Sequence, residues 1–530
     1  VPPTKAPPTA VPPTATPAPP KIAGNLRIAI KQDAAVLNPY LGFSETETFV
    51  IGLVYDTLLY WDPEKDLQPG LADSWAFGDD GKSISFKLNP NAKWHDGTPV
   101  TVQDVIYSAD LVKAKFPQIG RSVANVTKVE AVGEREVKFS LSQPWPDAPR
   151  YIGNTISIVP KAVWEKITDP ANFTNLEKPI GSGAFAFKER AAGQRIVLEN
   201  TGKHHRIKPN IQTITLEVVG DESVAVMALK KGDLDALSWD VSPSLALDVR
   251  DKPANYPNIK LATAAGTSTK TLMFNLRKAP FNDVKFRQAV AKAIDTKSII
   301  DKALMGLADP LGPGLVASSA GWYNSKVAMV AFDAEKAKTE LEAAGYKDAN
   351  KDGLRELPDG KPLKVTIIVP VGQPSTDVGD IMAANLTKVG IQAEVKPLAP
   401  DAFLNQLRLG DFDAALSGPS MSIQPGMMFF YFHSSRGVIT SGRVAGFNYG
   451  GYNSPEYDKL ADASSKEVDW AKRKDILFQM QELLAKDMPQ VPLYVPKVLN
   501  LYRDDKLTGW VVKPSSGILN SETFQKLQAK

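Results

Sequence analysis

The sequence contains no cysteine. A disulfide framework, a thiolate metal site and a thiol nucleophile are therefore excluded. Histidine is nearly as scarce, with four residues in 530, and none has the HExxH or HxH spacing of zinc sites. The Walker loop, the GxSxG motif and the GxGxxG motif are also absent. The usual signatures of metalloenzymes, nucleotide-binding proteins and serine hydrolases are thus missing. A hydrolase that acts through paired carboxylates stays open as a rival, because such pairs converge in space.

An excess of charge of one sign is also lacking. The chain has 62 basic and 59 acidic side chains, a formal net charge of +3. This balance argues against nucleic acid or an anionic membrane as the partner. No apolar run approaches the roughly 18–20 residues that a membrane-spanning helix needs. With 43% hydrophobic and 23% charged residues, the composition is that of an ordinary globular protein.

The first 21 residues have a composition of their own. VPPTKAPPTAVPPTATPAPP is rich in proline, threonine and alanine, with nine prolines in twenty residues. Such a segment cannot build a core and is expected to be extended and semi-rigid. It is either a plain disordered tail or a spacer between a membrane anchor and a globular body. We favour the spacer, which predicts an extracytoplasmic, membrane-tethered protein.

The length of 530 residues predicts two or three domains. Residues 46–184 are rich in short alternating patterns such as Ile84, Phe86 and Leu88, which predict strands. From residue 274 onward, helix and strand patterns alternate regularly. Either Asn282 or Asp283 is suited to cap one helix there, and Asp333 is suited to cap another. This alternation predicts an α/β fold with largely parallel strand pairing.

Residues 67–108 are the most diagnostic stretch. They read LQPGLADSWAFGDDGKSISFKLNPNAKWHDGTPVTVQDVIYS. Thr101 and Asp104 are spaced as a helix capping box. The segment resembles the signature region of the peptide/nickel-type (family 5) extracytoplasmic solute-binding proteins of ABC importers. Further similar segments follow in the family's order: PIGSGAF (179–185), ALKKGDLDAL (228–237), FNLRKAPFNDVKFRQAVAKAID (274–295), FDAEKAKTELEAAGY (332–346), GDFDAAL (410–416), NYGGYNSPEYDKL (448–460) and MPQVPLYV (488–495).

The resemblance implies a two-lobed, Venus-flytrap fold with an extra strand-rich domain inserted in the first lobe. The first lobe is then expected in 22–45, 185–273 and 497–530, the inserted domain in 46–184, and the second lobe in 274–496. It also implies a monomer that is not an enzyme and needs no cofactor. Such a protein captures a solute by hinge closure and delivers it to an ABC permease.

The resemblance places the ligand between the lobes, beside the second-lobe segment 416–432. Peptide-binding members commonly carry an aspartate there that pairs with the peptide's ammonium group. This chain instead offers Gly418, Ser420, Met421 and Gln424, and has no acid between Asp413 and Glu456. A buried ammonium without a counter-charge is costly. We therefore expect a neutral oligosaccharide, with an oligopeptide or dipeptide as the alternative and a nickel or metallophore cargo as a more distant one.

Several side chains are candidates for contacts with such a ligand. Trp239 is the main stacking candidate, and Trp322 and Tyr323 are secondary ones. Asn275 and Asn448 are candidate polar contacts. Core packing is an equally reasonable role for each aromatic residue. His204 and His205 are expected at the surface, and His95 in a structural turn.

One loop has the spacing of a calcium site. Asp348, Asn350, Asp352 and Glu356 occupy positions 1, 3, 5 and 9 of a calcium-loop pattern. The carbonyl of Leu354 would serve at position 7 and Asp359 at position 12. The pattern departs from an EF-hand, because position 12 is the shorter Asp and a strand pattern follows. A structural calcium ion is one interpretation, and an Asx-rich surface turn is the other.

Overall fold

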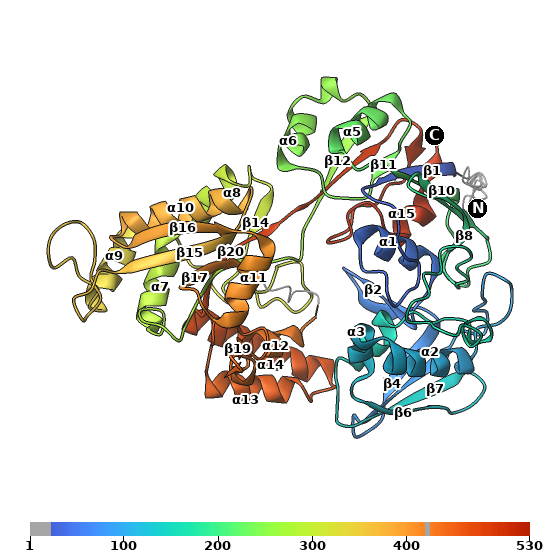
Figure 1. Ribbon diagram of the computed structural model, residues 1–530, viewed down its shortest axis with the longest axis horizontal. Coiled ribbons are helices and arrows are strands. Elements are labelled where there is room, and N and C mark those ends of the chain that lie inside the picture. The colour runs from blue at the N-terminus through green and yellow to red at the C-terminus, as the bar shows by residue number, and fades with distance from the viewer. Residues whose placement is uncertain (1–22, 419–423) are drawn as a thin grey trace, which may run out of the picture.

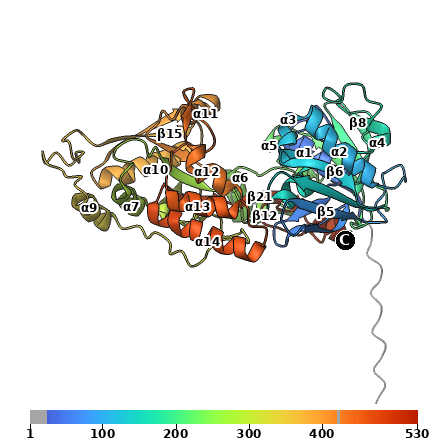
Figure 2. The same cartoon turned by 90° about the horizontal axis from the view of Figure 1, so that it is seen from below.

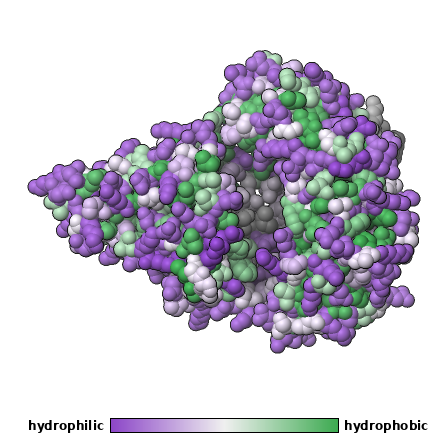
Figure 3. All heavy atoms as spheres, viewed as in Figure 1, coloured by the Kyte–Doolittle hydropathy of each residue, from purple (hydrophilic) through white to green (hydrophobic). Residues whose placement is uncertain are grey.

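The computed structural model describes residues 23–418 and 424–530 of the chain. They form two halves around a hollow that Figure 3 shows from one side. One half contains the first lobe and the inserted domain, and the other is the second lobe (Figure 1). The fold is α/β and two-lobed, as the sequence predicts.

The first lobe is built on a seven-stranded sheet in the order β12-β21-β11-β1-β10-β9-β8. The central strand β1 pairs in parallel with β10 and β11, and Leu26, Ile28 and Ile30 on it are fully buried. These three side chains alternate along the strand and therefore bury one face of it in the core. The strands are β1 (Ala23–Ile30), β8 (Phe185–Ala191), β9 (Arg195–Asn200), β10 (Ile211–Val218), β11 (Ala236–Leu237), β12 (Ile259–Ala264) and β21 (Val498–Arg503). The helices are α1 (Glu45–Val54), α5 (Glu222–Lys231) and α6 (Pro243–Asp251).

The inserted domain holds an antiparallel sheet in the order β4-β5-β7-β6. The predicted alternation is confirmed, because Ile84 lies opposite Phe139, and the rings of Phe86 and Phe139 meet edge to face at 5.7 Å. The Thr101–Asp104 capping box that begins α2 is also confirmed. The main elements are β2 (Leu59–Asp62), β3 (Asp66–Pro69), β4 (Ala72–Phe77), β5 (Ser83–Leu88), α2 (Val102–Lys115), β6 (Val126–Ala131) and β7 (Glu136–Leu141).

The second lobe has a six-stranded sheet in the order β14-β20-β13-β17-β15-β16. The prediction of largely parallel pairing is wrong, because three of the five strand pairings are antiparallel: β15 is parallel to β16 and β17, but β13 is antiparallel to β17 and β20, and β14 is antiparallel to β20. The chain enters the lobe along β13 and leaves it along β20, so these neighbours must run in opposite directions. The strands are β13 (Lys270–Phe274), β14 (Ala308–Pro310), β15 (Lys364–Pro370), β16 (Gln392–Leu398), β17 (Ala414–Ser417) and β20 (Gln490–Pro496). The helices include α7 (Val284–Ala293), α8 (Thr296–Lys302), α9 (Ala334–Ala343), α10 (Ser375–Lys388), α11 (Pro400–Leu409), α12 (Met427–Phe432), α13 (Pro455–Ser464) and α14 (Trp470–Asp487).

Two segments cross between the lobes. Residues 265–269 connect β12 to β13, and Lys497 connects β20 to β21. The crossing strands are paired on both sides, because β12 pairs with β21 in the first lobe and β13 with β20 in the second. In both ribbon views β21 lies where the halves meet (Figures 1 and 2). This two-segment crossing is the expected geometry of a hinge.

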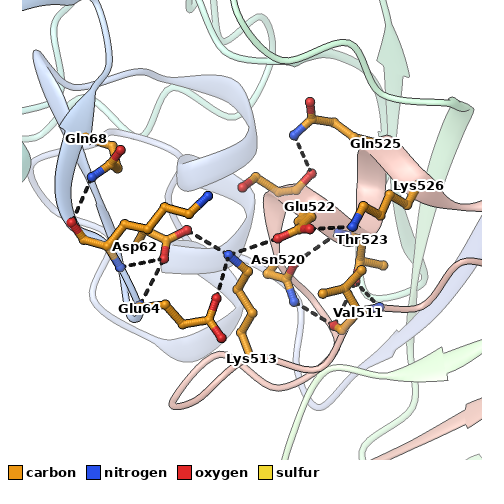
Figure 4. Close-up of polar contacts among 12 residues, drawn as sticks. Asp62, Glu64, Gln68, Val511, Lys513, Asn520, Glu522, Thr523, Gln525 and Lys526 are labelled. Carbon is orange, nitrogen blue, oxygen red and sulfur yellow. Dashed lines mark hydrogen bonds and ion pairs between the residues drawn. The ribbon is translucent and has the colours of Figure 1, made fainter. Parts of the chain in front are cut away.

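The C-terminal segment ties the first lobe to the inserted domain through one buried lysine (Figure 4). The side chain of Lys513 is 6% exposed, and its Nζ lies 2.7 Å from Asp62, 3.0 Å from Glu522 and 3.6 Å from Glu64. Asp62 and Glu64 come from the β2–β3 hairpin, and Glu522 from α15 (Ser521–Lys526). A buried cation needs this neutralising charge, so the cluster fixes the two units against each other.

Candidate ligand-binding cleft

The first-lobe wall of the cleft is formed by residues that follow parallel strands. Lys31 comes directly after β1, and Asp240 comes three residues after β11. The carboxyl ends of parallel strands meet at one edge of a sheet, where α/β proteins bind ligands. Asp240 Oδ1 accepts a hydrogen bond from the backbone N–H of Leu499, at 2.8 Å. Because Leu499 lies two residues beyond the Lys497 crossing, Asp240 sits at the base of the hinge.

This wall carries two carboxylates and one lysine. Glu45 begins α1, where Ser44 is the N-cap. Partial burial raises the pKa of Glu45, an effect that Lys31 opposes and Asp240 assists. The same desolvation raises the pKa of Asp240, against the opposing effects of the Leu499 N–H and Lys31. Both side chains still reach water. Because both residues are exposed, they present two negative charges to solvent at this wall.

The second-lobe wall is formed by the ends of β13 and β17 that face the hinge. The backbone passes so close at Gly418 that an added Cβ would lie 2.3 Å from the carbonyl oxygen of Thr269. Glycine is therefore required there for packing. The same Cβ position is 3.4 Å from Nζ of Lys270, whose side chain lies along this edge. Burial lowers the pKa of Lys270.

An aromatic cavity of about 430 Å³ lies between the inserted domain and the second lobe. Thr267, in the crossing segment, is also part of its lining. Next to the lining residues Arg150 and Pro425, Tyr151 donates a long hydrogen bond of 3.4 Å to Gln424 Oε1. The aromatic side chains of the lining are Trp61, Trp75, Phe77, Trp322 and Trp470.

Beside this cavity the two units are joined by an ion pair. Arg473 of α14 donates to both carboxylate oxygens of Asp147, with Nη1–Oδ1 at 2.7 Å and Nη2–Oδ2 at 2.9 Å. The two side chains are 4% and 14% exposed. Gly426 packs directly against Asp147, since a Cβ there would lie 2.1 Å from Oδ2. This bidentate pair links the second lobe to the inserted domain away from the hinge.

The predicted aromatic contacts lie in different surroundings. Trp239 is 2% exposed and packs in the first-lobe core, with Lys31 Nζ 5.4 Å from its ring centroid. Its indole nitrogen has no hydrogen-bond partner among the described residues. Trp322 is 3% exposed and contributes to the aromatic cavity, with Tyr323 packed near it. Ser420 and Met421 lie outside the described residues.

The predicted polar contacts Asn275 and Asn448 serve the backbone. The Nδ2 group of Asn275 donates to the carbonyls of Gly410 and Phe412, both at 2.9 Å. That of Asn448 donates to the carbonyl of Tyr452 at 2.8 Å, and its Oδ1 accepts from the Tyr452 N–H. Both residues are at most 2% exposed. Because these amides are already occupied, we leave both residues out of the binding site.

The expectation that the histidine pair is exposed is wrong for His204, which is 8% exposed. Its Nδ1 accepts the backbone N–H of Ile207, at 2.7 Å, and its Nε2 lies 3.2 Å from Asp56. Ligand atoms of Asp56, His204 and His205 lie within 4.8 Å of one another. Both ring nitrogens of His204 are engaged by the protein, which argues against metal binding there. His95 bonds to the backbone at Gly183 and Gly181, as expected of a turn residue.

The calcium-like loop brings three of its predicted ligands together. One carboxylate oxygen each from Asp348, Asp352 and Glu356 lies within 4.8 Å of the others. The remaining contacts are those of an Asx-rich turn. Asn350 Oδ1 accepts the N–H of Asp352, Asp352 Oδ1 accepts that of Leu354, and Asp359 pairs with Lys361 at 2.7 Å. The three carboxylates are suitable ligands for calcium, but the carboxylate of Asp359 forms an ion pair with Lys361.

The most useful cleft residues were not among the predicted ones. Glu45, Asp240 and Lys270 carry the charges of the two walls, and no local motif marks them. The available signal for Lys31 and Asp240 was a position within three residues after a strand that ends near the hinge. The expected counter-charge was confined to residues 413–456, and both acids lie outside that segment.

Comparison with known proteins identifies the family. Residues 66–440 match the family described as bacterial extracellular solute-binding proteins, family 5 Middle. The chain belongs to the family 5 extracellular solute-binding proteins of ABC importers. Among family 5 relatives, the oligopeptide-binding protein AppA of Bacillus subtilis is 28% identical over 516 residues, covering 95% of this chain and 92% of AppA.

Solved family 5 structures are similar over nearly the whole chain. AppA of Bacillus subtilis in complex with a nonapeptide has a TM-score of 0.69 at 26% identity, covering 97% of this chain and all of that one. The periplasmic oligopeptide-binding protein of Thermotoga maritima has a TM-score of 0.80 at 26% identity, covering 96% and 99%. Within the described residues, we find no helix long and apolar enough to cross a bilayer.

Proposed function

We propose that this protein binds peptides between its lobes, through their free ammonium group, and delivers them to an ABC permease. The observation that carries this proposal is the pair of carboxylates, Glu45 and Asp240, on the first-lobe wall. An ammonium group that leaves water on hinge closure needs an anionic acceptor. The two acids outnumber Lys31, so the wall can supply that acceptor.

This proposal replaces the oligosaccharide expected from the sequence. That preference depended on the absence of an acid between Asp413 and Glu456. Glu45 and Asp240 supply acids on the opposite wall, and the relatives described above are named for oligopeptides. The aromatic cavity would then receive an apolar peptide side chain.

We further propose that residues 1–21 act as a spacer that holds the binding protein near its permease. Their proline-rich composition supports an extended segment. The bound peptide is released unchanged in this mechanism. Recovery of intact peptide after long incubation, measured by mass spectrometry, distinguishes it from a hydrolase.

Isothermal titration calorimetry with a mixed library of tri-, penta- and nonapeptides tests the function. The same library with acetylated N-termini and a set of cello-, xylo- and malto-oligosaccharides are the comparison ligands. We expect binding of the free peptides and a roughly ten- to hundredfold loss on acetylation, the range for a charged hydrogen bond. Binding of the sugars alone would contradict the proposal.

The variant Glu45→Gln keeps the shape of the side chain and removes its charge. We expect this variant to bind the free peptides more weakly and to bind the acetylated peptides with unchanged affinity. Glu335→Gln, at the exposed first turn of α9, is the matched control and should bind like the unaltered protein. Equal weakening of free and acetylated peptides by Glu45→Gln would mean that Glu45 acts on the fold and not on the ammonium group.

A further inference from the structure

Lys270 is a half-buried lysine at the hinge-facing edge of the second lobe. It is the first residue of β13, directly after the crossing segment, and it lies opposite Tyr494 of β20. Tyr494 is 2% exposed, and burial raises its pKa to about 12. On its other side Lys270 lies against Gly418. The Lys270 side chain therefore lies along a close-packed backbone at this edge, with its Nζ 3.4 Å from the position of a Cβ at Gly418.

No counter-charge accompanies this lysine. Its side chain has no hydrogen bond or ion pair with any residue that the structure describes, and desolvation is the sole cause that lowers its pKa. Two buried cations of the chain do have carboxylate partners: Arg473 has Asp147, and Lys513 has Asp62 and Glu522. The shielded Arg277 and Arg287 donate hydrogen bonds to backbone carbonyls. A partly desolvated cation without a partner is unfavourable in the unliganded protein.

The first-lobe wall, on the opposite side of the cleft, has an excess of negative charge. Glu45 and Asp240 stand across the hinge on the first lobe, with two negative charges against Lys31. A molecule that carries an ammonium group at one end and a carboxylate at the other would satisfy both walls when the lobes close. A peptide with free ends is such a molecule. A neutral oligosaccharide would leave both sets of charges unpaired.

We propose that Lys270 is the receptor for the ligand's carboxylate, and that the charges on the two walls fix the direction in which a peptide lies in the cleft. This inference rests on the proposed peptide function and adds to it a specificity-determining residue. The carboxylate neutralises a cation that the unliganded protein leaves unpaired. Charge-assisted hydrogen bonds of this kind are stronger than neutral ones and sensitive to geometry.

The test compares peptides with free and amidated C-termini. The probes are the library of tri-, penta- and nonapeptides and the same library as C-terminal amides, titrated into the full protein by calorimetry. We expect the unaltered protein to prefer the free acids roughly ten- to hundredfold. Lys270→Met should abolish that preference by weakening the binding of the free acids alone. Lys270→Arg should keep part of the preference.

Lys364→Met is the matched control, because Lys364 is an exposed lysine at the start of β15, a strand of the same sheet. It should preserve the preference. The melting temperature of the unliganded protein gives a second readout. Lys270→Met should melt at the same temperature or higher, because it removes a desolvated charge that nothing neutralises. A loss of melting temperature together with equal weakening of acids and amides would show a structural role and overturn the inference.

The failure of this inference is distinguishable from the failure of the peptide function. If peptides bind but amidation changes nothing, peptide binding stands and the role of Lys270 falls. If no peptide of either library binds the unaltered protein, the peptide function falls and the role of Lys270 falls with it.

Discussion

Arg473 on the second lobe and Asp147 on the inserted domain form a bidentate ion pair at 2.7 and 2.9 Å, with little exposure of either side chain. The residues are 326 positions apart in the chain. The pair joins the second lobe to the inserted domain beside the aromatic cavity, which Thr267 of the crossing segment also lines. Its consequences for stability and for lobe movement can be measured separately.

Asp147→Ala should destabilise the protein markedly. It leaves the Arg473 guanidinium shielded from water without its counter-charge, a change that typically costs about 3–5 kcal/mol. Urea unfolding measures this loss, and small-angle scattering should show a larger radius of gyration as the halves separate. Glu130→Gln, which removes the acid of an exposed pair in the same domain, should change neither quantity. An unchanged radius for Asp147→Ala would mean that the pair does not restrain the lobes.

Ligand affinity should depend on pH through the first-lobe acids. Desolvation raises the pKa of both Glu45 and Asp240 above their ordinary values of 4.5 and 3.8. Only the ionised form attracts an ammonium group, so affinity for free peptides should fall on acidification at a pH above the usual carboxylate range. Affinity for acetylated peptides should not follow this fall. Calorimetry from pH 7 downward measures both, and parallel curves would contradict ammonium recognition.

Glu45 and Asp240 also affect the stability of the unliganded protein, and here acidification is favourable. A carboxyl group whose pKa is raised on folding binds protons more readily in the folded state, so its contribution to stability declines as pH rises through the folded-state value. Glu45→Gln removes this contribution for one group. Compared with the unaltered protein, the variant should therefore gain melting temperature at neutral pH and lose that gain in acid. A constant difference across the pH range would argue against a raised pKa at Glu45.

Lys513→Met should weaken the junction of the first lobe and the inserted domain. Asp62, 7% exposed, would lose its buried partner, and such a loss typically costs about 3–5 kcal/mol. Burial alone would raise the pKa of Asp62. The hydrogen bonds from Lys513 and from two backbone N–H groups outweigh this effect and lower the pKa below 3.8. The stability that this group contributes is present above that value and is lost as pH falls through the folded-state pKa.

Acid unfolding followed by circular dichroism checks this prediction. The unaltered protein should lose stability steeply at low pH, and Lys513→Met should show a shallower slope from a lower plateau. Lys526→Met is a suitable control, because Lys526 contacts Glu522 from an exposed position. A plateau as high as that of the unaltered protein would show that the cluster around Lys513 adds no net stability.

Calcium provides a test of the loop 348–359. Three carboxylates within 4.8 Å are a suitable donor set, and we expect millimolar calcium to raise the melting temperature. Calcium at ten times its dissociation constant would add about 1.4 kcal/mol. Asp352→Asn should reduce the effect, while Asp359→Asn should not, because Asp359 pairs with Lys361. No shift in the unaltered protein would leave the loop as an Asx-rich turn.

Local features of the fold could be predicted because they depend on neighbouring residues. The caps at Thr101, Asp283 and Asp333 and the alternation around Phe86 each involve residues a few positions apart. The antiparallel pairing of β13 with β20 could not be predicted this way. It depends on the chain returning to the first lobe, more than two hundred residues after it left.

The site was harder to predict for the same reason. Glu45, Asp240 and Lys270 come from widely separated segments, and each is an ordinary charged residue in its local sequence. Asn275 and Asn448 were predicted as polar ligand contacts, and both lie in segments that resemble the family. Their amides compensate backbone groups in the interior, which is the usual use of a buried asparagine.

The second lobe is attached at two separate places, the paired crossing strands and the Asp147–Arg473 ion pair. A rigid body held at two points keeps one degree of freedom, rotation about the line that joins them. While the ion pair persists, the lobe can swing but cannot twist. Groups near this axis, Asp240 among them, keep almost constant surroundings when the lobe rotates. The side chains farthest from the axis undergo the largest displacement.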